Sequence, residues 1–232
     1  MPIVRCKLLP NKTNRTMTRP TSLLFSFLAC AALVSCTVDA YEKGEGDNSL
    51  LTAELVEATV DADKQVTKVI TDDALTLTLT QPYTAKWIAR ADTTYRALLY
   101  YNKVGSAQAE VVNMSSVGVL RPMVADSLKE GMKTDPLYVE SIWQARSGRY
   151  INIRLRLLTG QVDDDDAKQS IGIVDNGSSP SHMRLQLYHD QGGQPEYYSS
   201  IAVISLPTSA ITADTVSISI NTYDGTVTRT FP

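Results

Sequence analysis

The chain has two histidines, His182 and His189, whose imidazoles could ligate a metal ion or act as general bases. Both fall in one predicted strand, 182–189, and their odd separation of seven residues places them on opposite faces. At the rise of a β-strand they stand roughly 23 Å apart, so they cannot share a metal ion. A serine hydrolase would also need a nucleophile elbow of the Gly-x-Ser-x-Gly kind, which the sequence lacks. We therefore predict no catalytic residue, no cofactor and no metal site, and the protein is not expected to be an enzyme.

A run of four aspartates, Asp163–Asp166, could offer hard oxygen ligands to calcium. An EF-hand loop, however, places its acids at alternating positions, with a glycine at the sixth position and a glutamate at the twelfth, and this run does not follow that pattern. The segment between Thr159 and Lys168 is therefore expected to be a solvated hairpin loop without a metal ion.

Three side chains, Trp87, Arg96 and Tyr100, are the candidate ligand contacts. Aromatic rings can stack on bases or sugars, and a cation beside them strengthens such binding. Arg96 and Tyr100 share one face of a predicted strand. Tyr95 and Tyr101 share the other face with apolar residues, so these two tyrosines are expected to pack in a core or at its rim.

An apolar run of twelve residues, 23–34, follows a basic stretch and leads into the sequence Leu33-Val34-Ser35-Cys36. Twelve residues suit the core of a signal peptide but fall short of the ~20 needed to span a bilayer. The sequence at the end of the run resembles the lipobox of bacterial lipoproteins. The resemblance implies that Cys36 is diacylated, that residues 1–35 are removed as a signal peptide, and that the new amino terminus is acylated. Two start positions stay open, Met1 and Met17.

The residues around the lipidated cysteine indicate where the protein would be anchored. Thr37 follows Cys36 in place of the aspartate that retains lipoproteins in the inner membrane, so the resemblance implies the outer membrane. Residues 36–48 contain scattered acids and glycines and are expected to form a flexible acidic tether. Because the acids are not consecutive, both a cell-surface and a periplasmic orientation stay open. Cys6 and Cys30 leave with the signal peptide, so no intrachain disulfide is expected.

The charge of the chain is unevenly distributed. Residues 1–35 carry five basic side chains and no acidic one, which leaves 17 basic against 25 acidic residues in the remainder. Nucleic-acid binding depends on the neutralisation of phosphates by lysine and arginine, so this acidic remainder argues against a nucleic-acid partner.

Two groups of strands follow the tether, and both alternate with the period of two that marks half-buried strands. The first group has five predicted strands, at 50–60, 65–71, 74–80, 95–103 and 109–120. A single long connection lies between the third and the fourth, and Pro82 interrupts the pattern after the third. Five strands with one such excursion are typical of a small closed barrel, and an OB-like barrel is predicted for residues 49–121.

Residues 122–136 lack periodicity and contain three turn-forming prolines and glycines, so they are expected to form a linker. About seven predicted strands follow it, at 138–146, 149–159, 168–174, 182–189, 197–206, 215–222 and 226–231. Their short lengths and turn signals predict an antiparallel β-sandwich over 137–232, in an all-β protein. Trp143, at its opening, is expected to anchor the core.

Three segments of this second domain carry a family resemblance: 135–143 (DPLYVESIW), 148–156 (GRYINIRLR) and 183–190 (MRLQLYHD). Together with the lipobox and the strand order, they make the chain similar to the NigD-like family of bacterial lipoproteins. The resemblance implies an OB-like amino-terminal domain followed by a β-sandwich, in agreement with the strand patterns. The family has no established reaction or ligand, so only the lipid cysteine carries over as a functional residue.

Two functions follow as expectations. The first is a non-enzymatic outer-membrane lipoprotein, held in the bilayer by Cys36, that presents a binding surface for a protein, a bacteriocin or a glycan. The alternative, suggested by the bacteriocin gene cluster from which the family takes its name, is a periplasm-facing bacteriocin-immunity or envelope structural lipoprotein.

Overall fold

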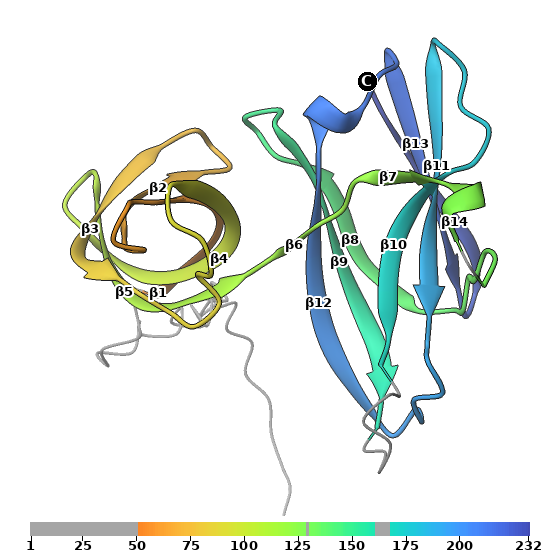
Figure 1. Ribbon diagram of the computed structural model, residues 1–232, viewed down its shortest axis with the longest axis horizontal. Coiled ribbons are helices and arrows are strands. Elements are labelled where there is room, and N and C mark those ends of the chain that lie inside the picture. Colours follow the sequence, from red (N-terminus) through yellow and green to blue (C-terminus); the bar gives the residue numbers. More distant parts are fainter. Residues whose placement is uncertain (1–50, 129, 161–167) are drawn as a thin grey trace, which may run out of the picture. The chain divides into compact units, whose positions relative to one another are not determined.

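The computed structural model describes residues 51–128, 130–160 and 168–232. The predicted lipid cysteine, the tether at 36–48 and the run Asp163–Asp166 lie outside these residues. The described part of the chain is all-β, as predicted: a closed five-stranded barrel is followed by two further sheets, and only two three-residue 3-10 turns accompany the strands (Figure 1). These turns are η1 (Ala125–Ser127) and η2 (Thr208–Ala210).

The first five strands close into a barrel in the order β1-β2-β3-β5-β4. They are β1 (Leu51–Val60), β2 (Val66–Thr71), β3 (Thr76–Tyr83), β4 (Thr93–Val104) and β5 (Gln108–Ser116). The pairing of β3 with β5 is parallel, and the other four pairings are antiparallel. This is the five-stranded Greek-key arrangement of an OB barrel, so the prediction from strand number and spacing is confirmed. β3 runs on through Pro82, where the sequence pattern had suggested an end at Thr80.

The barrel core follows from the alternation of its strands. Leu77 and Leu79 are buried, while the threonines between and beside them are exposed. In β4 the buried face holds Ala97, Leu99 and Tyr101, as the sequence indicated. Ile88, from the long connection between β3 and β4, is also buried in this core, so the connection closes part of the barrel rather than lying free.

Two sheets form the sandwich of the second domain. One has the order β14-β13-β11-β10-β7 and the other the order β6-β12-β9-β8. The strands are β6 (Gly118–Val119), β7 (Pro122–Val124), β8 (Tyr138–Gln144), β9 (Tyr150–Thr159), β10 (Ser170–Asp175), β11 (His182–Asp190), β12 (Tyr198–Pro207), β13 (Thr215–Thr222) and β14 (Gly225–Phe231).

Two features of the strand pairing in these sheets differ from the sequence interpretation. β6 and β7 fall where the sequence indicated the end of the barrel domain and a linker, yet β6 pairs with β12 and β7 with β10. Each sheet therefore gains a short edge strand, and two or three residues are too few to show a periodic pattern. The pairings of β6, β7 and β11·β13 are parallel, so the sheets are mixed rather than antiparallel.

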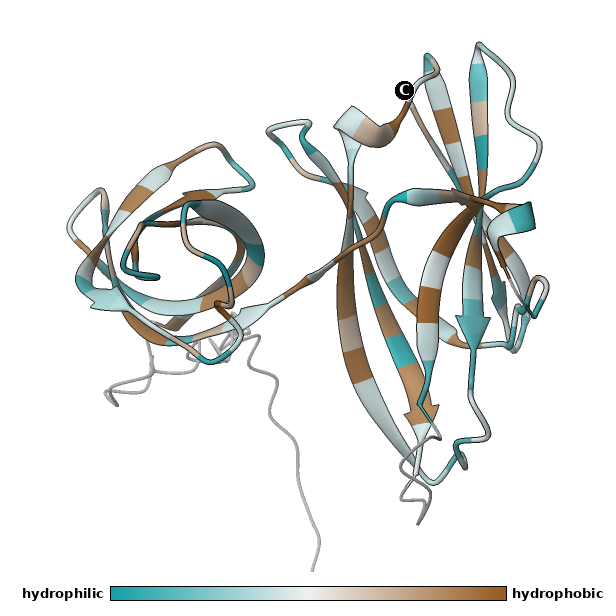
Figure 2. Ribbon diagram, viewed as in Figure 1, coloured by the Kyte–Doolittle hydropathy of each residue, from teal (hydrophilic) through white to brown (hydrophobic). Residues whose placement is uncertain are grey.

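The sandwich core lies between these two sheets. Along β9 the residues Ile151, Ile153, Leu155 and Leu157 are buried, and the cluster also contains Leu137 and apolar side chains of β10, β11, β12 and β13. Figure 2 shows the resulting alternation as brown and paler bands along β9 and β12. No helix in the described part of the chain has the length and apolar character needed to cross a membrane.

Candidate ligand groove between barrel and sandwich

Arg96 of β4 is buried, with 4 % of its surface exposed, instead of projecting into solvent as a ligand contact. Its Nη2 donates to Asp72 Oδ2 at 2.8 Å and to Asn152 Oδ1 at 3.1 Å. Its Nε donates to Ser205 Oγ at 3.1 Å. Asp72 follows β2 of the barrel, whereas Asn152 and Ser205 belong to β9 and β12 of the sandwich. The guanidinium group therefore joins the two domains.

The partners of Arg96 also bond to one another. Asn152 Nδ2 donates to Asp72 Oδ2 at 2.8 Å, and Ser205 Oγ donates to Asn152 Oδ1 at 2.7 Å. The Tyr150 ring lies 4.1 Å from the Arg96 guanidinium carbon, in a cation–π contact. We call Asp72, Arg96, Tyr150, Asn152 and Ser205 the junction network. Buried polar groups that bond to one another in this way fix the geometry of the parts they connect.

A second ion pair flanks this network. Arg149 Nη1 donates to Glu57 Oε2 at 2.5 Å, and the Tyr150 hydroxyl donates to Glu57 Oε1 at 2.9 Å. Burial, followed by the neighbouring Glu57 carboxylate, raises the pKa of Tyr150 from the ordinary tyrosine value. Glu57 is in β1, so this pair also connects barrel and sandwich.

Two cavities open beside the junction network, with volumes of about 320 and about 520 Å³. They share four lining residues: Leu98, Tyr100, Arg154 and Val203. We call the two together the junction groove. The smaller lobe is completed by Ala53, Glu54, Leu55, Thr71, Asp72, Asp73 and Trp143, and the larger by Ser115, Ser116, Val117, Ile201 and Ala202.

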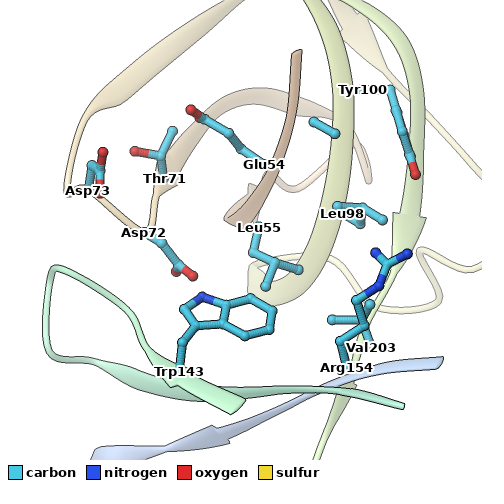
Figure 3. A pocket seen from close by; sticks show the side chains of 11 residues that line it. Glu54, Leu55, Thr71, Asp72, Asp73, Leu98, Tyr100, Trp143, Arg154 and Val203 are labelled. Atoms are coloured by element: carbon cyan, nitrogen blue, oxygen red, sulfur yellow. The ribbon is translucent and has the colours of Figure 1, made fainter. Parts of the chain in front are cut away.

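Figure 3 shows how the side chains of the smaller lobe lie. The Trp143 indole forms its lower wall with its nitrogen on the side of Asp72, and Arg154 extends from the sandwich toward Leu98 and Tyr100. Trp143 is 36 % exposed, so it is a wall of the groove and not the core anchor that the sequence suggested. β8 pairs Trp143 with Asn152 of β9, and this register places the indole next to the junction network.

Most of the charged groups along the groove form ion pairs within the protein. Asp72 pairs with Arg96 at 2.7 Å, and Asp73 pairs loosely with Arg146 at 3.5 Å. Glu140 lies between two cations, with Arg154 Nε at 3.0 Å and Arg156 Nε at 3.4 Å.

Glu54 forms no ion pair within the described residues, but it accepts a hydrogen bond from the Tyr101 hydroxyl at 3.3 Å. Burial, followed by this carboxylate, raises the pKa of Tyr101 to about 12. Glu54 contributes one negative charge without an ion-pair partner, and the two arginines around Glu140 contribute one positive charge in excess. Counted together with the ion-pair partners, the charges at the groove therefore sum to zero.

The three predicted contact residues do not meet in one place. Tyr100 lines both lobes of the groove, and Arg96 lies beneath it in the junction network. Trp87 belongs to the barrel core instead: its Nε1 donates to Met114 O at 3.3 Å, and its ring lies edge-on to Tyr95 with 5.5 Å between centroids.

Sequence reasoning missed Trp143 and Arg154 as groove residues. Both alternate outward along neighbouring strands, and Arg154 was expected to point out, but the pairing of β8 with β9 is needed to bring them together. The sequence does contain a partial signal for these two residues, because both face outward on predicted strands. That signal identifies the groove only if the two strands are also known to pair.

The histidines also occupy separate environments. His182 Nε2 lies 2.7 Å from Ser217 Oγ, and His189 Nδ1 lies 2.9 Å from Asp135 O. Within the described part of the chain no carboxylate bonds to His182, so its serine contact is not extended into a triad. The same residues contain no group of three or more His, Cys, Asp or Glu side chains that could hold a metal ion.

Several solved structures share this architecture. A NigD-like immunity protein of Bacteroides caccae is 23 % identical, with a TM-score of 0.60 over 77 % of this chain and 91 % of its own. A protein of unknown function from Bacteroides vulgatus is 14 % identical, with a TM-score of 0.56 over 78 % and 90 %. A candidate lipoprotein of Bacteroides fragilis is 13 % identical, with a TM-score of 0.54 over 78 % and 96 %. At these identities the likeness shows the fold alone.

A search of curated proteins found no match. The family models give a more specific result, because the model described as the NigD-like C-terminal beta sandwich domain matches residues 121–232. This match begins just before β7, the strand that the sequence had placed in a linker. Residues 121–232 are therefore a NigD-like C-terminal β-sandwich domain, which confirms the resemblance of the sequence to the NigD-like family.

Proposed function

We propose that this protein is a non-enzymatic lipoprotein of the outer membrane that binds a ligand in the junction groove. In this proposal Cys36 is the acylated residue and residues 36–48 form the spacer between the bilayer and the two β domains. The lipobox-like sequence and the NigD-like domain support the anchoring. The name of the Bacteroides fragilis neighbour, a candidate lipoprotein, agrees with it.

The observation that carries the binding role is the junction groove itself. Small-molecule sites form preferentially at domain junctions, in concave regions of about 300–1,000 Å³ with aromatic walls and a few polar groups. The two lobes have this size, and Trp143 and Tyr100 supply the aromatic walls.

Membrane fractionation of tagged variants tests the anchoring. Cys36→Ala removes the thiol that would receive the lipid, so the variant is expected to leave the membrane fraction. Cys30→Ala is the matched control, because it changes the cysteine of the apolar run just before the lipobox-like sequence and leaves Cys36 in place. A Cys36→Ala protein that still fractionates with membranes as fully as the control would contradict the proposal.

A second candidate function is immunity to a bacteriocin, carried out by a domain that faces the periplasm. It is favoured by the name of the Bacteroides caccae neighbour, a NigD-like immunity protein. Protease treatment of intact cells that carry an epitope-tagged chain separates the two orientations, with a periplasmic protein as the control for leakage. Loss of the tag favours a surface binding protein. Full protection, together with greater bacteriocin sensitivity of a deletion strain, favours immunity.

A further inference from the structure

We propose that the ligand of the junction groove is a neutral oligosaccharide, whose sugar rings stack on Trp143 and Tyr100. The inference rests on the proposed function and names the class of ligand for the same groove. It follows from the charge balance of the lining, from the aromatic walls, and from the polar groups that are left without partners.

The ion pairs along the groove argue against an ionic ligand. A cationic ligand would call for carboxylates without partners, and an anionic ligand for free guanidinium or ammonium groups. Here Asp72 is paired with Arg96 and Asp73 with Arg146, while Arg154 shares Glu140 with Arg156. The single surplus negative charge at Glu54 is matched by the surplus positive charge at the Arg154 side. Counted together with their ion-pair partners, the four carboxylates at the groove are matched by four guanidinium groups, so the groove and its partners have no net charge with which to attract an ion.

The aromatic walls favour a ligand with flat apolar faces. Trp143 is 36 % exposed although it lies in a paired strand, and Tyr100 is half-buried against both lobes. An exposed indole face costs free energy in water and gains it when an apolar surface covers it. The ring carbons and hydrogens of a sugar form such a surface, while its hydroxyls point outward from the ring.

The polar groups of the lining suit those hydroxyls. Four groups make no side-chain hydrogen bond within the described residues: the Trp143 indole nitrogen, the Tyr100 hydroxyl and the hydroxyls of Ser115 and Ser116. Donors thus occur in both lobes, and the carboxylates of Glu54 and Asp73 provide acceptors in the smaller one. A hydroxyl both donates and accepts, so a polyhydroxylated ligand can satisfy this mixed set where an apolar ligand would leave it unpaired.

The size of the groove favours an oligosaccharide over a single sugar. The lobes of about 320 and about 520 Å³ meet at Arg154 and Tyr100. A ligand that spans both therefore passes the guanidinium group and can place a ring on each side of it. Among the described residues Arg154 bonds to Glu140 through Nε alone, so its charge is paired while its terminal N–H groups can donate to ring or hydroxyl oxygens.

The test measures binding by isothermal titration calorimetry to the full chain in detergent. The probes are neutral oligosaccharides of glucose, mannose, galactose and xylose, with an oligolysine peptide and a sulfated oligosaccharide as charged comparisons. Trp143→Ala is expected to weaken the binding of the neutral probe about tenfold or more. Tyr197→Ala is the matched control, because it removes an aromatic ring that is 75 % exposed and lies outside the groove.

A second variant guards against a folding defect in Trp143→Ala. Tyr100→Phe keeps the ring and removes only the hydroxyl, so it is expected to fold and to weaken the neutral probe by about two- to tenfold. Circular dichroism of each variant checks the fold.

If only the charged probes bind, and Trp143→Ala abolishes that binding, the proposed ligand class is wrong. The proposed role of the groove in binding would still hold. Absence of binding by every probe, or binding that neither groove variant changes, would overturn the inference. The anchoring at Cys36 is decided separately by fractionation.

Discussion

The substitution Arg96→Met tests whether the junction network stabilises the two-domain structure. Methionine keeps much of the length of the side chain but removes the charge and every donor. Three hydrogen bonds are lost, to Asp72, Asn152 and Ser205, together with the cation–π contact to Tyr150. The Asp72 carboxylate then keeps one side-chain donor, Asn152 Nδ2.

The expected cost follows from the burial of the pair. Removal of one partner from a buried ion pair typically destabilises a protein by about 3–5 kcal/mol, because the other charge stays buried without compensation. The Arg96 side chain is 1 % exposed, but that of Asp72 is 19 % exposed, so water can reach the carboxylate in part. We therefore expect the lower end, about 3 kcal/mol. For a chain of this size that loss lowers the melting temperature by about 6–12 °C.

A double-mutant cycle separates the charge from the packing. Asp72→Asn in the Arg96→Met background removes the uncompensated charge, so the double variant is expected to lose less than the two single variants added together, by about 2 kcal/mol. One guanidinium nitrogen, Nη1, is buried without a hydrogen-bond partner in the described structure, so the wild-type pair already carries a desolvation cost that the double variant escapes.

Guanidinium denaturation followed by tryptophan fluorescence and circular dichroism measures these free energies of unfolding. Arg146→Met is the matched control, because Arg146 and Asp73 form an ion pair at the same junction that is 83 % and 57 % exposed. Its loss is expected to change stability by no more than about 0.5 kcal/mol. If Arg96→Met costs no more than Arg146→Met, the junction network does not stabilise the described structure and the reasoning is refuted.

Two further predictions concern titrating groups. The Lys133 ammonium and the Gly192 backbone amide lower the pKa of Asp190 from 3.8, so its stabilising contribution is present above that value and is lost as the pH falls through the depressed pKa. Asp190→Asn should therefore lower the melting temperature by a few degrees at pH 7, and the gap from wild type should narrow in acid; an unchanged gap would contradict it. Tyr101, with a pKa of about 12, contributes stability below pH 10 that is lost as the pH rises through 12. Glu54→Gln should lower the pKa of Tyr101 toward 10.0 without reaching it, because burial is the larger cause of the shift. An NMR titration of labelled tyrosine measures this pKa, with Tyr101→Phe used to assign the signal. An unchanged pKa in Glu54→Gln would refute the prediction.

The strands themselves were predictable because each one carries its own signal. Ile151, Ile153 and Leu155 alternate with polar residues, and the structure buries all three completely. The same period of two identifies the buried face of β4. Such patterns depend only on which residues of one strand face a core, and this information is local in the sequence.

The junction network was not predictable in the same way. Arg96 meets Asp72 across 24 residues, Asn152 across 56 and Ser205 across 109. Nothing in the sequence around Arg96 distinguishes a cation exposed on the outer face of a barrel from one that a second domain covers. The parallel pairing of β11 with β13 was not predicted for a related reason. Alternation shows which residues of a strand face the core, but it does not show which strand lies beside it.

The groove of the proposal depends on both kinds of information. Tyr100 was identified because it alternates outward from β4, whereas Trp143 was assigned to a core because large aromatic residues usually anchor one. The indole stays 36 % exposed because β8 is an edge strand of its sheet, so no further strand covers it.

Intact-mass spectrometry of the full chain purified from membranes tests the central claim most directly. We predict a protein that begins at Cys36 and carries the added mass of a diacylglyceryl group and an amide-linked acyl chain. In Cys36→Ala protein that added mass should be absent. A wild-type protein that retains residues 1–35, or that is cleaved elsewhere and carries no lipid, would contradict the claim that this is an anchored binding protein.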